Sequence, residues 1–193
     1  MQLVFDFETL STDRINAPIV SMALIEFDES RFTTQTAYSY TELLEMSRMI
    51  TFNVESQVKD HGRKIDPDTL EWWGEQGAEA MAQLKPSEFD KPLSECIPFM
   101  VEHITDINKV YTRGNTFDPV ILDYIAQQFN QVVPYMHWEV RDTRSTIEGM
   151  AWGTDLENGF IPEGLEEHFV KHDPRHDVAM DVMRIQTLAI ALG

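Results

Sequence analysis

The amino-acid sequence predicts an α/β protein in which a mixed β-sheet is flanked by α-helices. Two observations at the ends of the chain carry this prediction. Residues 2–8 place large apolar side chains at every second position, as a strand does, and residues 177–192 are apolar along one side, as a packed helix is. The predicted order is three strands, two helices, and then strands and helices in alternation with a final pair of helices, which is typical of a mixed sheet covered by helices.

The start of the chain has the pattern of three antiparallel strands. Residues 2–8 form the first, and residues 19–27 and 31–40 show the same alternation. From residue 41 onward the pattern becomes helical or irregular. The elements expected after that point are a helix that begins at Asp66-Pro67-Asp68, a helix over 93–103, a strand over 109–112, a helix over 120–129, a strand at Val140, a helix over 143–150 and the last helix over 177–192.

Length and composition indicate a single domain over residues 1–193. The chain has 193 residues, of which 42% are hydrophobic, and this is enough for one sizeable core. Its 15 Lys and Arg against 33 Asp and Glu give a formal net charge of −18. This charge speaks against a broad surface that grips duplex nucleic acid, because phosphate binding depends on basic side chains. Any nucleic acid must be held locally.

Cysteine usage and hydropathy indicate the compartment. The lone Cys96 cannot form an internal disulfide, and no spacing of cysteine and histidine resembles a zinc site, which favours a reducing compartment. The N-terminal segment carries Asp6 and Glu8 with no base before Arg14, which is the reverse of a signal peptide. No apolar run is long enough to cross a bilayer. We expect a cytoplasmic protein with no membrane partner.

The first candidate motif is Asp6-Phe7-Glu8, which places two carboxylates on one face of the first strand. Their Cα atoms are about 6 to 7 Å apart in a strand, so both side chains can reach one or two divalent cations. Two acids on an internal strand repel each other and are costly to desolvate, and a cation relieves both effects. An edge strand with solvated acids explains the same residues, and so short a motif recurs by chance.

The second candidate motif is the segment 114–119, at a junction between a strand and a helix. Asp118 could be a cation ligand there. It could also be the N-cap of the helix, with Pro119 at the first helical position, or Asn115 could be the cap instead.

The third candidate motif runs from His176 to Asp181 and opens the last helix. These two residues lie about 140° apart in a regular helix, so they converge only if His176 sits in the entry turn. Asp177 and Asp181 share a face at i and i+4, and periodicity therefore ranks them equally as cation ligands. As polar residues of a first turn, His176 and Asp177 would need no functional role.

Taken in order, the three motifs resemble those of the DEDDh family of 3′-to-5′ exonucleases, which have a ribonuclease H-like fold. The resemblance covers nearly the whole chain and is closest to the T-even phage exonuclease A group, which is similar in turn to small bacterial DEDDh exoribonucleases. The segments that carry it are FDFETL at 5–10, TLEWW at 69–73, the Arg113–Asp118 junction, the Arg141–Arg144 segment and the closing His176-Asp177 motif.

The resemblance implies a set of catalytic residues and a cofactor. Four acidic ligands would hold two Mg²⁺ or Mn²⁺ ions, and His176 would be the general base. The resemblance selects Asp181 over Asp177. It also implies hydrolysis of single-stranded DNA or RNA from the 3′ end to 5′-mononucleotides, in the cytoplasm of a bacterial cell or of a phage-infected host. The four implied ligands are Asp6, Glu8, Asp118 and Asp181.

Substrate contacts are expected beside these motifs. Trp72 and Trp73 are 100° apart on a helix and cannot point the same way, so we expect one in the core and the other on the terminal base. Without the resemblance, core packing of both would be favoured. Among several arginines that flank the motifs, Arg144 is the first expected to touch phosphate. The other expected substrate contacts are Phe7, Thr9, Asn115 and Phe117.

A different class of function also fits the charge of the chain. A catalytically silent acidic protein could mimic nucleic acid and bind a nucleic-acid-binding partner. Such a protein does not need the complete set of motif residues, whereas the enzyme does. The sequence leaves the choice between DNA and RNA open, because no motif encodes a contact with the 2′-hydroxyl. It also leaves the oligomeric state open, a homodimer included.

Overall fold

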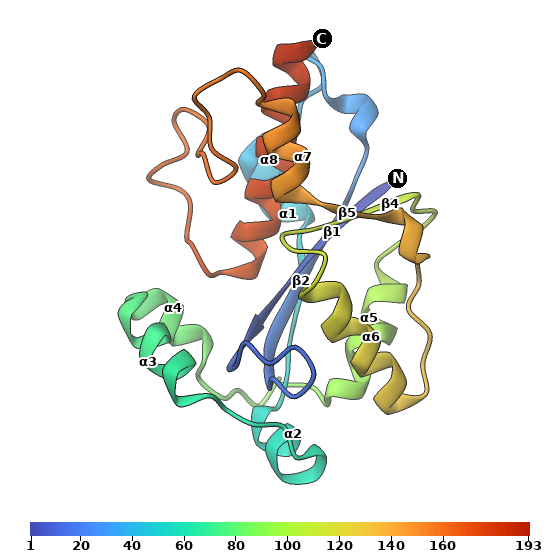
Figure 1. The fold of residues 1–193 in the computed structure, drawn as a ribbon, viewed down its shortest axis with the longest axis vertical. Helices are drawn as coiled ribbons and strands as arrows, with labels where there is room; N and C mark the ends of the chain where they lie inside the picture. Colours follow the sequence, from blue (N-terminus) through green and yellow to red (C-terminus); the bar gives the residue numbers. More distant parts are fainter.

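The computed structural model describes residues 1–193, the side chain of Glu79 apart, and confirms the α/β class. Strand β1 (Gln2–Thr9) lies in the middle of the sheet. On one side it pairs antiparallel with β2 (Ile19–Phe27), which pairs antiparallel with β3 (Arg48–Thr51). On the other side it pairs parallel with β4 (Lys109–Thr112), which is followed by β5 (Val140–Asp142), so the sheet is mixed (Figure 1).

Helices cover both faces of this sheet. One face carries Leu3 and Phe5 of β1 and packs against α5 (Cys96–Glu102) and α6 (Asp118–Phe129). The other face carries Val4 and packs against a layer in which α7 and α8 lie side by side (Figure 1). The helices of that layer are α1 (Tyr40–Met46), α7 (Thr143–Met150) and α8 (Pro174–Leu192).

The prediction of a strand over residues 31–40 is wrong. A 3-10 turn and an irregular loop occupy most of this segment, and α1 begins at its end. The polar side chains explain the difference, because they bind the loop itself. The hydroxyls of Thr33 and Thr36 lie 2.7 Å apart, and the hydroxyl of Ser39 caps the first turn of α1. The third antiparallel strand is β3 instead, which the sequence pattern did not indicate.

Most later elements confirm the prediction. Helix α3 (Pro67–Glu75) begins after its N-cap Asp66, and α8 begins at Pro174 rather than Asp177. The short helices α2 (Val54–His61) and α4 (Ala78–Gln83) were not expected. The described chain also contains the 3-10 helices η1 (Glu29–Arg31), η2 (Leu93–Glu95) and η3 (His137–Glu139).

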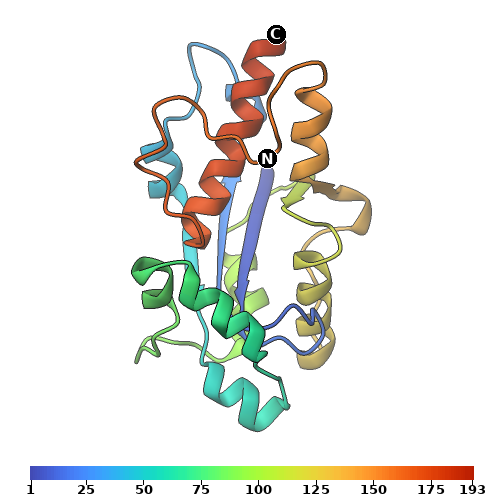
Figure 2. The same ribbon diagram turned by 60° about the vertical axis from the view of Figure 1, so that its left-hand side comes forward.

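Strand β1 extends beyond its parallel neighbour, and this overhang positions the site. In the described ladder β4 pairs with β1 only along Gln2 to Val4. Further along β1, the backbone N–H of Phe7 donates to Oδ1 of Asp118 at 3.2 Å. Figure 2 shows α3 lying across the end of β1, close to the start of α8. The end of β1, the start of α6, the start of α8 and α3 therefore meet at one place.

None of the helices described is long and apolar enough to cross a membrane.

Candidate active site

A cleft of about 750 Å³ opens at the C-terminal half of β1. Its walls come from parts of the chain that are far apart in sequence, including β1, α3, the junction between β4 and α6, and the start of α8. It contains charges of both signs. The carboxylates that line it are Asp6, Glu8, Asp118 and Asp177, and the basic side chains are Arg113, Arg144, Lys171 and Arg184.

Strand β1 supplies two of these carboxylates because its side chains alternate between faces. Phe5 and Phe7 point into the core beneath α6, and Asp6 and Glu8 point to the opposite side, into the cleft. The regular pairing with β2 is interrupted between Glu8 and Thr9. Glu8 is nevertheless buried, so its carboxylate meets the cleft rather than open solvent.

The third carboxylate is tied to the backbone of β1. Asp118 is the first residue of α6, and the N-cap of that helix is Phe117, whose side chain makes no cap hydrogen bond within the described chain. Neither Asp118 nor Asn115 therefore acts as the cap that the sequence allowed. Instead Oδ1 of Asp118 accepts the N–H of Phe7, the residue between Asp6 and Glu8. This bond holds the buried Asp118 carboxylate next to the first two.

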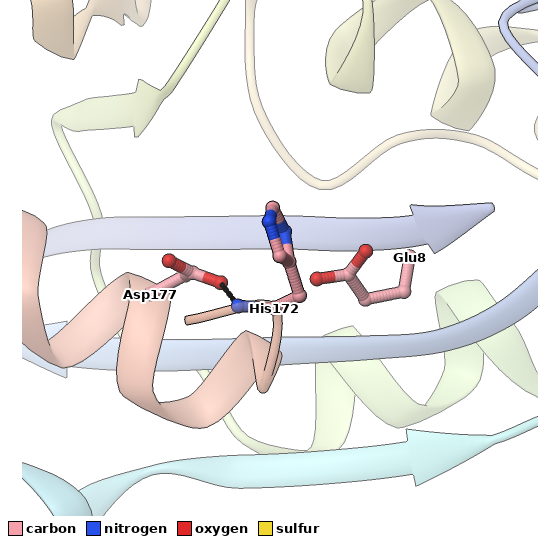
Figure 3. A group of neighbouring side chains, drawn as sticks. All are labelled: Glu8, His172 and Asp177. Atoms are coloured by element: carbon pink, nitrogen blue, oxygen red, sulfur yellow. Dashed lines mark hydrogen bonds between the residues drawn. The ribbon is translucent and has the colours of Figure 1, made fainter. Parts of the chain in front are cut away.

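The fourth carboxylate comes from the first turn of α8. Oδ2 of Asp177 accepts the backbone N–H of His172 at 2.9 Å, and His172 has a left-handed backbone with φ of 65°. The hydrogen bond offsets part of the cost of that backbone, which is uncommon outside glycine. One ligand atom from each of Glu8, His172 and Asp177 lies within 4.8 Å of the others (Figure 3).

Burial raises the pKa of all four carboxyl groups above their ordinary values. Burial is the main cause for Asp118 and for Asp177, and it raises the pKa of each to about 7. The pKa values of Asp6 and Glu8 are raised well above their usual range, first by burial and then by repulsion from neighbouring carboxylates. The ionised cluster is therefore costly without a counter-charge.

This donor set fits a divalent cation. Carboxylate oxygens are the ligands that Mg²⁺ and Mn²⁺ prefer, and the cation would offset the repulsion that raises the pKa values. Nε2 of His172 is buried and has no hydrogen-bond partner among the described residues. Burial also lowers the pKa of His172, which favours the neutral imidazole, the form that can accept a proton or a metal ion.

The structure does not bring His176 and Asp181 to the lining of the cleft. Nδ1 of His176 accepts the N–H of Val170 at 3.3 Å and lies 2.8 Å from the hydroxyl oxygen of Tyr40. Asp181 lies one turn beyond Asp177 and is 3% exposed. The carboxylate of Asp181 accepts hydrogen bonds from two arginines and a threonine, namely Arg113, Arg184 and Thr143.

The two tryptophans of α3 have different surroundings. Trp73 is 1% exposed and donates from Nε1 to the carbonyl of Thr9 at 3.0 Å. Trp72 is 41% exposed, and its ring centroid lies 4.7 Å from that of His172. Trp72 lines the cleft and also an adjoining hollow of about 510 Å³. Phe7, Glu8 and Phe117 line both spaces as well, so the two lie side by side.

The remaining expected contacts lie in three different places. Arg144 lines the cleft. Thr9 lines the adjoining hollow, where its hydroxyl donates to the carbonyl of Ser11 at 2.8 Å. Asn115 lines a separate hollow beside α6, and its backbone N–H donates to Asp142 at 3.3 Å. The structure therefore does not place Asn115 with the other expected contacts.

Sequence reasoning gave His172 no role. Periodicity ranked Asp177 and Asp181 equally, and the family resemblance selected Asp181. A usable signal was present, because His172 and Asp177 have the same separation as His176 and Asp181. A helix that starts at Pro174 leaves His172 outside it and puts Asp177 in the first turn. The same start puts His176 inside the helix, where it points away from Asp181.

Comparisons with known proteins agree on one family. Residues 1–185 match a family model described as the 3′-5′ exoribonuclease Rv2179c-like domain. The exodeoxyribonuclease of Enterobacteria phage T4 is 30% identical over 210 residues, an alignment that covers 98% of this chain and 90% of the phage protein.

Two solved structures are similar in fold. A structure of exonuclease I matches with a TM-score of 0.61 and 17% identity, covering 96% of this chain and 40% of that one. A zinc-bound complex of E. coli exonuclease I with single-stranded DNA matches with a TM-score of 0.56 and 15% identity, covering 97% and 39%. The present chain thus spans about 40% of the length of these solved chains. The likeness confirms the ribonuclease H-like fold.

The family model spans residues 1–185, and the phage relative is 30% identical with 90% of its length covered. The chain therefore belongs to the DEDDh family of 3′-5′ exonucleases, within which it is a 3′-5′ exoribonuclease Rv2179c-like domain.

Proposed function

We propose that residues 1–193 form one exonuclease domain that hydrolyses single-stranded DNA or RNA from the 3′ end. The products would be 5′-mononucleotides, and the cofactor Mg²⁺ or Mn²⁺. The convergence of four carboxylates in one cleft carries this proposal, two of them buried (Glu8 and Asp118) and two half-buried (Asp6 and Asp177). A nucleic-acid mimic would display its acids to solvent, whereas here Asp6, Glu8, Asp118 and Asp177 share a site where their ionised forms are costly.

Four carboxylates suffice to hold two divalent cations. When bound, such ions activate a water molecule for attack and neutralise the charge that develops on the phosphate. In this proposal Asp177 takes the place that the resemblance gave to Asp181. The reason is that Asp181 is already paired with two guanidinium groups, whereas Asp177 lines the cleft beside Glu8.

His172 takes the place that the resemblance gave to His176. A neutral imidazole can accept a proton from the attacking water, and Nε2 of His172 has no other partner among the described residues. Two hydrogen bonds hold the backbone of His172. Its N–H donates to Asp177, and its carbonyl accepts from Nε2 of Gln83 at 2.9 Å.

The 3′-terminal nucleotide would occupy the hollow that adjoins the cleft. Trp72 and Phe117 offer aromatic surface to a base, and stacking of this kind tolerates any base. Arg144 and Lys171 are basic side chains of the cleft that could meet phosphate oxygens. The solved complex of exonuclease I with single-stranded DNA supports a single-stranded substrate.

The test uses matched DNA and RNA oligonucleotides labelled at the 5′ end, incubated with Mg²⁺, with Mn²⁺ or with excess EDTA. We expect a descending ladder of labelled products with either metal and none with EDTA. Asp177→Asn should abolish the ladder. Immediate release of a labelled mononucleotide, cuts in a closed circle or undiminished cleavage in EDTA would contradict the proposal. Absence of cleavage under all conditions would favour the mimic.

A further inference from the structure

Asp181 joins two arginines beneath the wall of the cleft. Its Oδ1 accepts hydrogen bonds from Nη1 of Arg113 at 2.7 Å and from Nη1 of Arg184 at 2.8 Å. Its Oδ2 accepts the hydroxyl of Thr143 at 2.9 Å. Both arginines also line the cleft. Two guanidinium groups share one carboxylate, so the group as a whole carries a net positive charge.

The two arginines differ in whether a ligand in the cleft can reach their guanidinium groups. Arg184 is buried, and its other nitrogens donate to the carbonyls of Phe160 at 2.7 Å and Gly159 at 3.3 Å. It therefore anchors the segment that forms one side of the cleft. The side chain of Arg113 is 23% exposed, and its Nη2 donates to Asn158 in the same segment. Arg113 is the member of the group that a ligand in the cleft can reach.

Arg113 needs to be held where it is. The same cleft is lined by the carboxylates of Asp6, Glu8, Asp118 and Asp177, and a mobile guanidinium could swing to pair with them and compete with divalent cations. The hydrogen bonds to Asp181 and Asn158 fix Arg113 at the wall instead. A guanidinium so fixed is suited to a phosphodiester oxygen, because its planar donors are already oriented.

We propose that Asp181 is a positioning residue that holds Arg113 at the wall of the cleft, where Arg113 contacts a phosphate of the bound strand. Arg184 completes the arrangement by fixing the backbone at 159–160. This inference rests on the proposed function for the identity of the ligand, a phosphodiester strand. It assigns Asp181 to substrate binding and separates it from the cation ligands.

The test measures affinity without turnover. The protein is loaded with Ca²⁺, and binding of a fluorescent single-stranded oligonucleotide is followed by anisotropy at several KCl concentrations. Arg113→Gln and Asp181→Asn should each weaken binding about tenfold, since each loses a charge-assisted contact. Each should also reduce the slope of log affinity against log salt by about 0.7, the value for one phosphate contact on a single strand. The double variant should be no weaker than Arg113→Gln.

Two matched controls accompany these variants. Glu42→Gln removes a carboxylate that pairs with Arg31 away from the cleft, and it should bind like the wild type. Asp177→Asn should lose Mn²⁺ binding measured by electron paramagnetic resonance, whereas Asp181→Asn should keep it. If Asp181→Asn does not fold, as judged by circular dichroism, Arg113→Gln carries the test because its side chain is partly exposed.

The other possible results would overturn either this inference or the proposed function. Loss of Mn²⁺ binding in a folded Asp181→Asn would make Asp181 a cation ligand and overturn the inference. Wild-type affinity and slope in Arg113→Gln would also overturn it. A wild-type protein that binds the strand with these variant effects but cleaves no oligonucleotide would refute the proposed function and leave the role of Asp181 standing.

Discussion

Two aspartates of α8 show how the surroundings of a side chain determine what it can bind. Asp177 and Asp181 are chemically identical and lie one turn apart on α8. Asp177 faces Glu8 and His172, and its pKa is raised to about 7 by burial and by repulsion from Asp181. Asp181 faces two guanidinium groups and a hydroxyl. The first residue therefore suits a cation, and the second suits the arginines.

The two histidines before these acids allow a direct test of the proposed base. His172→Ala should lower kcat by a factor of about 10² to 10⁴, because proton transfer from the attacking water loses its acceptor. His176→Ala, the matched control, should keep kcat within about threefold of the wild type. Kinetics on a labelled oligonucleotide at saturating Mg²⁺ would measure both variants.

The reverse result would restore the assignment drawn from the resemblance. If His176→Ala loses turnover and His172→Ala keeps it, His176 is the base. Binding of Mn²⁺ by His172→Ala separates a base from a ligand. Retained binding with lost turnover indicates the base, and lost binding indicates that His172 is itself a metal ligand.

At the scale of elements, strands and helices with a periodic sequence pattern could be predicted. Contacts between segments that are distant in the sequence could not. The strand at residues 2–8 and the helix at Asp66 carry local signals, alternation in one case and a cap with proline in the other. Residues 31–40 also alternate, yet Thr33 and Thr36 bond within the loop and prevent a strand. The alternation of apolar residues cannot reveal that side-chain hydrogen bonds within the loop compete with strand formation.

The sequence could predict those residues of the candidate site that lie in short local motifs. Asp6, Glu8 and Asp118 follow from a strand end and a helix start, and the structure brings all three into one cleft. The choice between Asp177 and Asp181 depends on Arg113, which is distant in the sequence. No periodicity along α8 can reveal a partner on another element, so both acids appear equivalent until the fold is known.

Helix α3 buries Trp73 in the core and leaves Trp72 exposed in the cleft. Replacing Trp72 should therefore affect substrate binding, and replacing Trp73 should affect stability. Trp72→Ala should raise KM about 10- to 100-fold with little loss of stability, because a base loses its stacking surface. Trp73→Ala should lower the free energy of unfolding by about 3 to 5 kcal/mol, because Trp73 fills a buried space. Steady-state kinetics and urea unfolding would measure the two effects.

Trp72→Phe is the matched control for the first of these variants, since it keeps an aromatic face. It should recover most of the affinity. A KM unchanged in Trp72→Ala would show that the terminal base does not stack there. A KM unchanged together with a reduced kcat would show that Trp72 acts mainly through the ring of His172, which it contacts.

At the scale of the whole molecule, the excess of acidic side chains should couple the binding of cations to the stability of the folded protein. The formal net charge is −18, and four of the negatively charged side chains line one cleft. Ligands that bind only the folded state stabilise it by mass action. Divalent cations should therefore raise the melting temperature of the protein, and chelation should lower it.

The metal-free protein should lose stability as pH rises from about 5 to about 8. The pKa values of Asp118 and Asp177 are about 7 in the folded chain and near 4 when unfolded, so folding favours their protonated forms. That contribution is complete below the unfolded pKa and is lost as pH passes the folded pKa. Thermal unfolding in EDTA across this range would show the decline.

Asp118→Asn provides the internal comparison for this pH dependence. An amide at position 118 can still accept the N–H of Phe7, and it carries no charge at any pH. The variant should be at least as stable as the wild type at pH 8 without metal, and its stability should change less between pH 5 and pH 8. Equal pH dependence in the two proteins would show that Asp118 is ionised throughout.

The hydrogen bond from the backbone of Phe7 to Asp118 also constrains which sequences can build this site. Any residue except proline supplies that N–H, so a survey that truncates the side chains of β1 would leave the bond intact and overlook it. Proline at position 7 would remove the donor and leave the carboxylate of Asp118 without its tether. The alignment of the cleft thus depends on a peptide group as well as on the side chains that make it acidic.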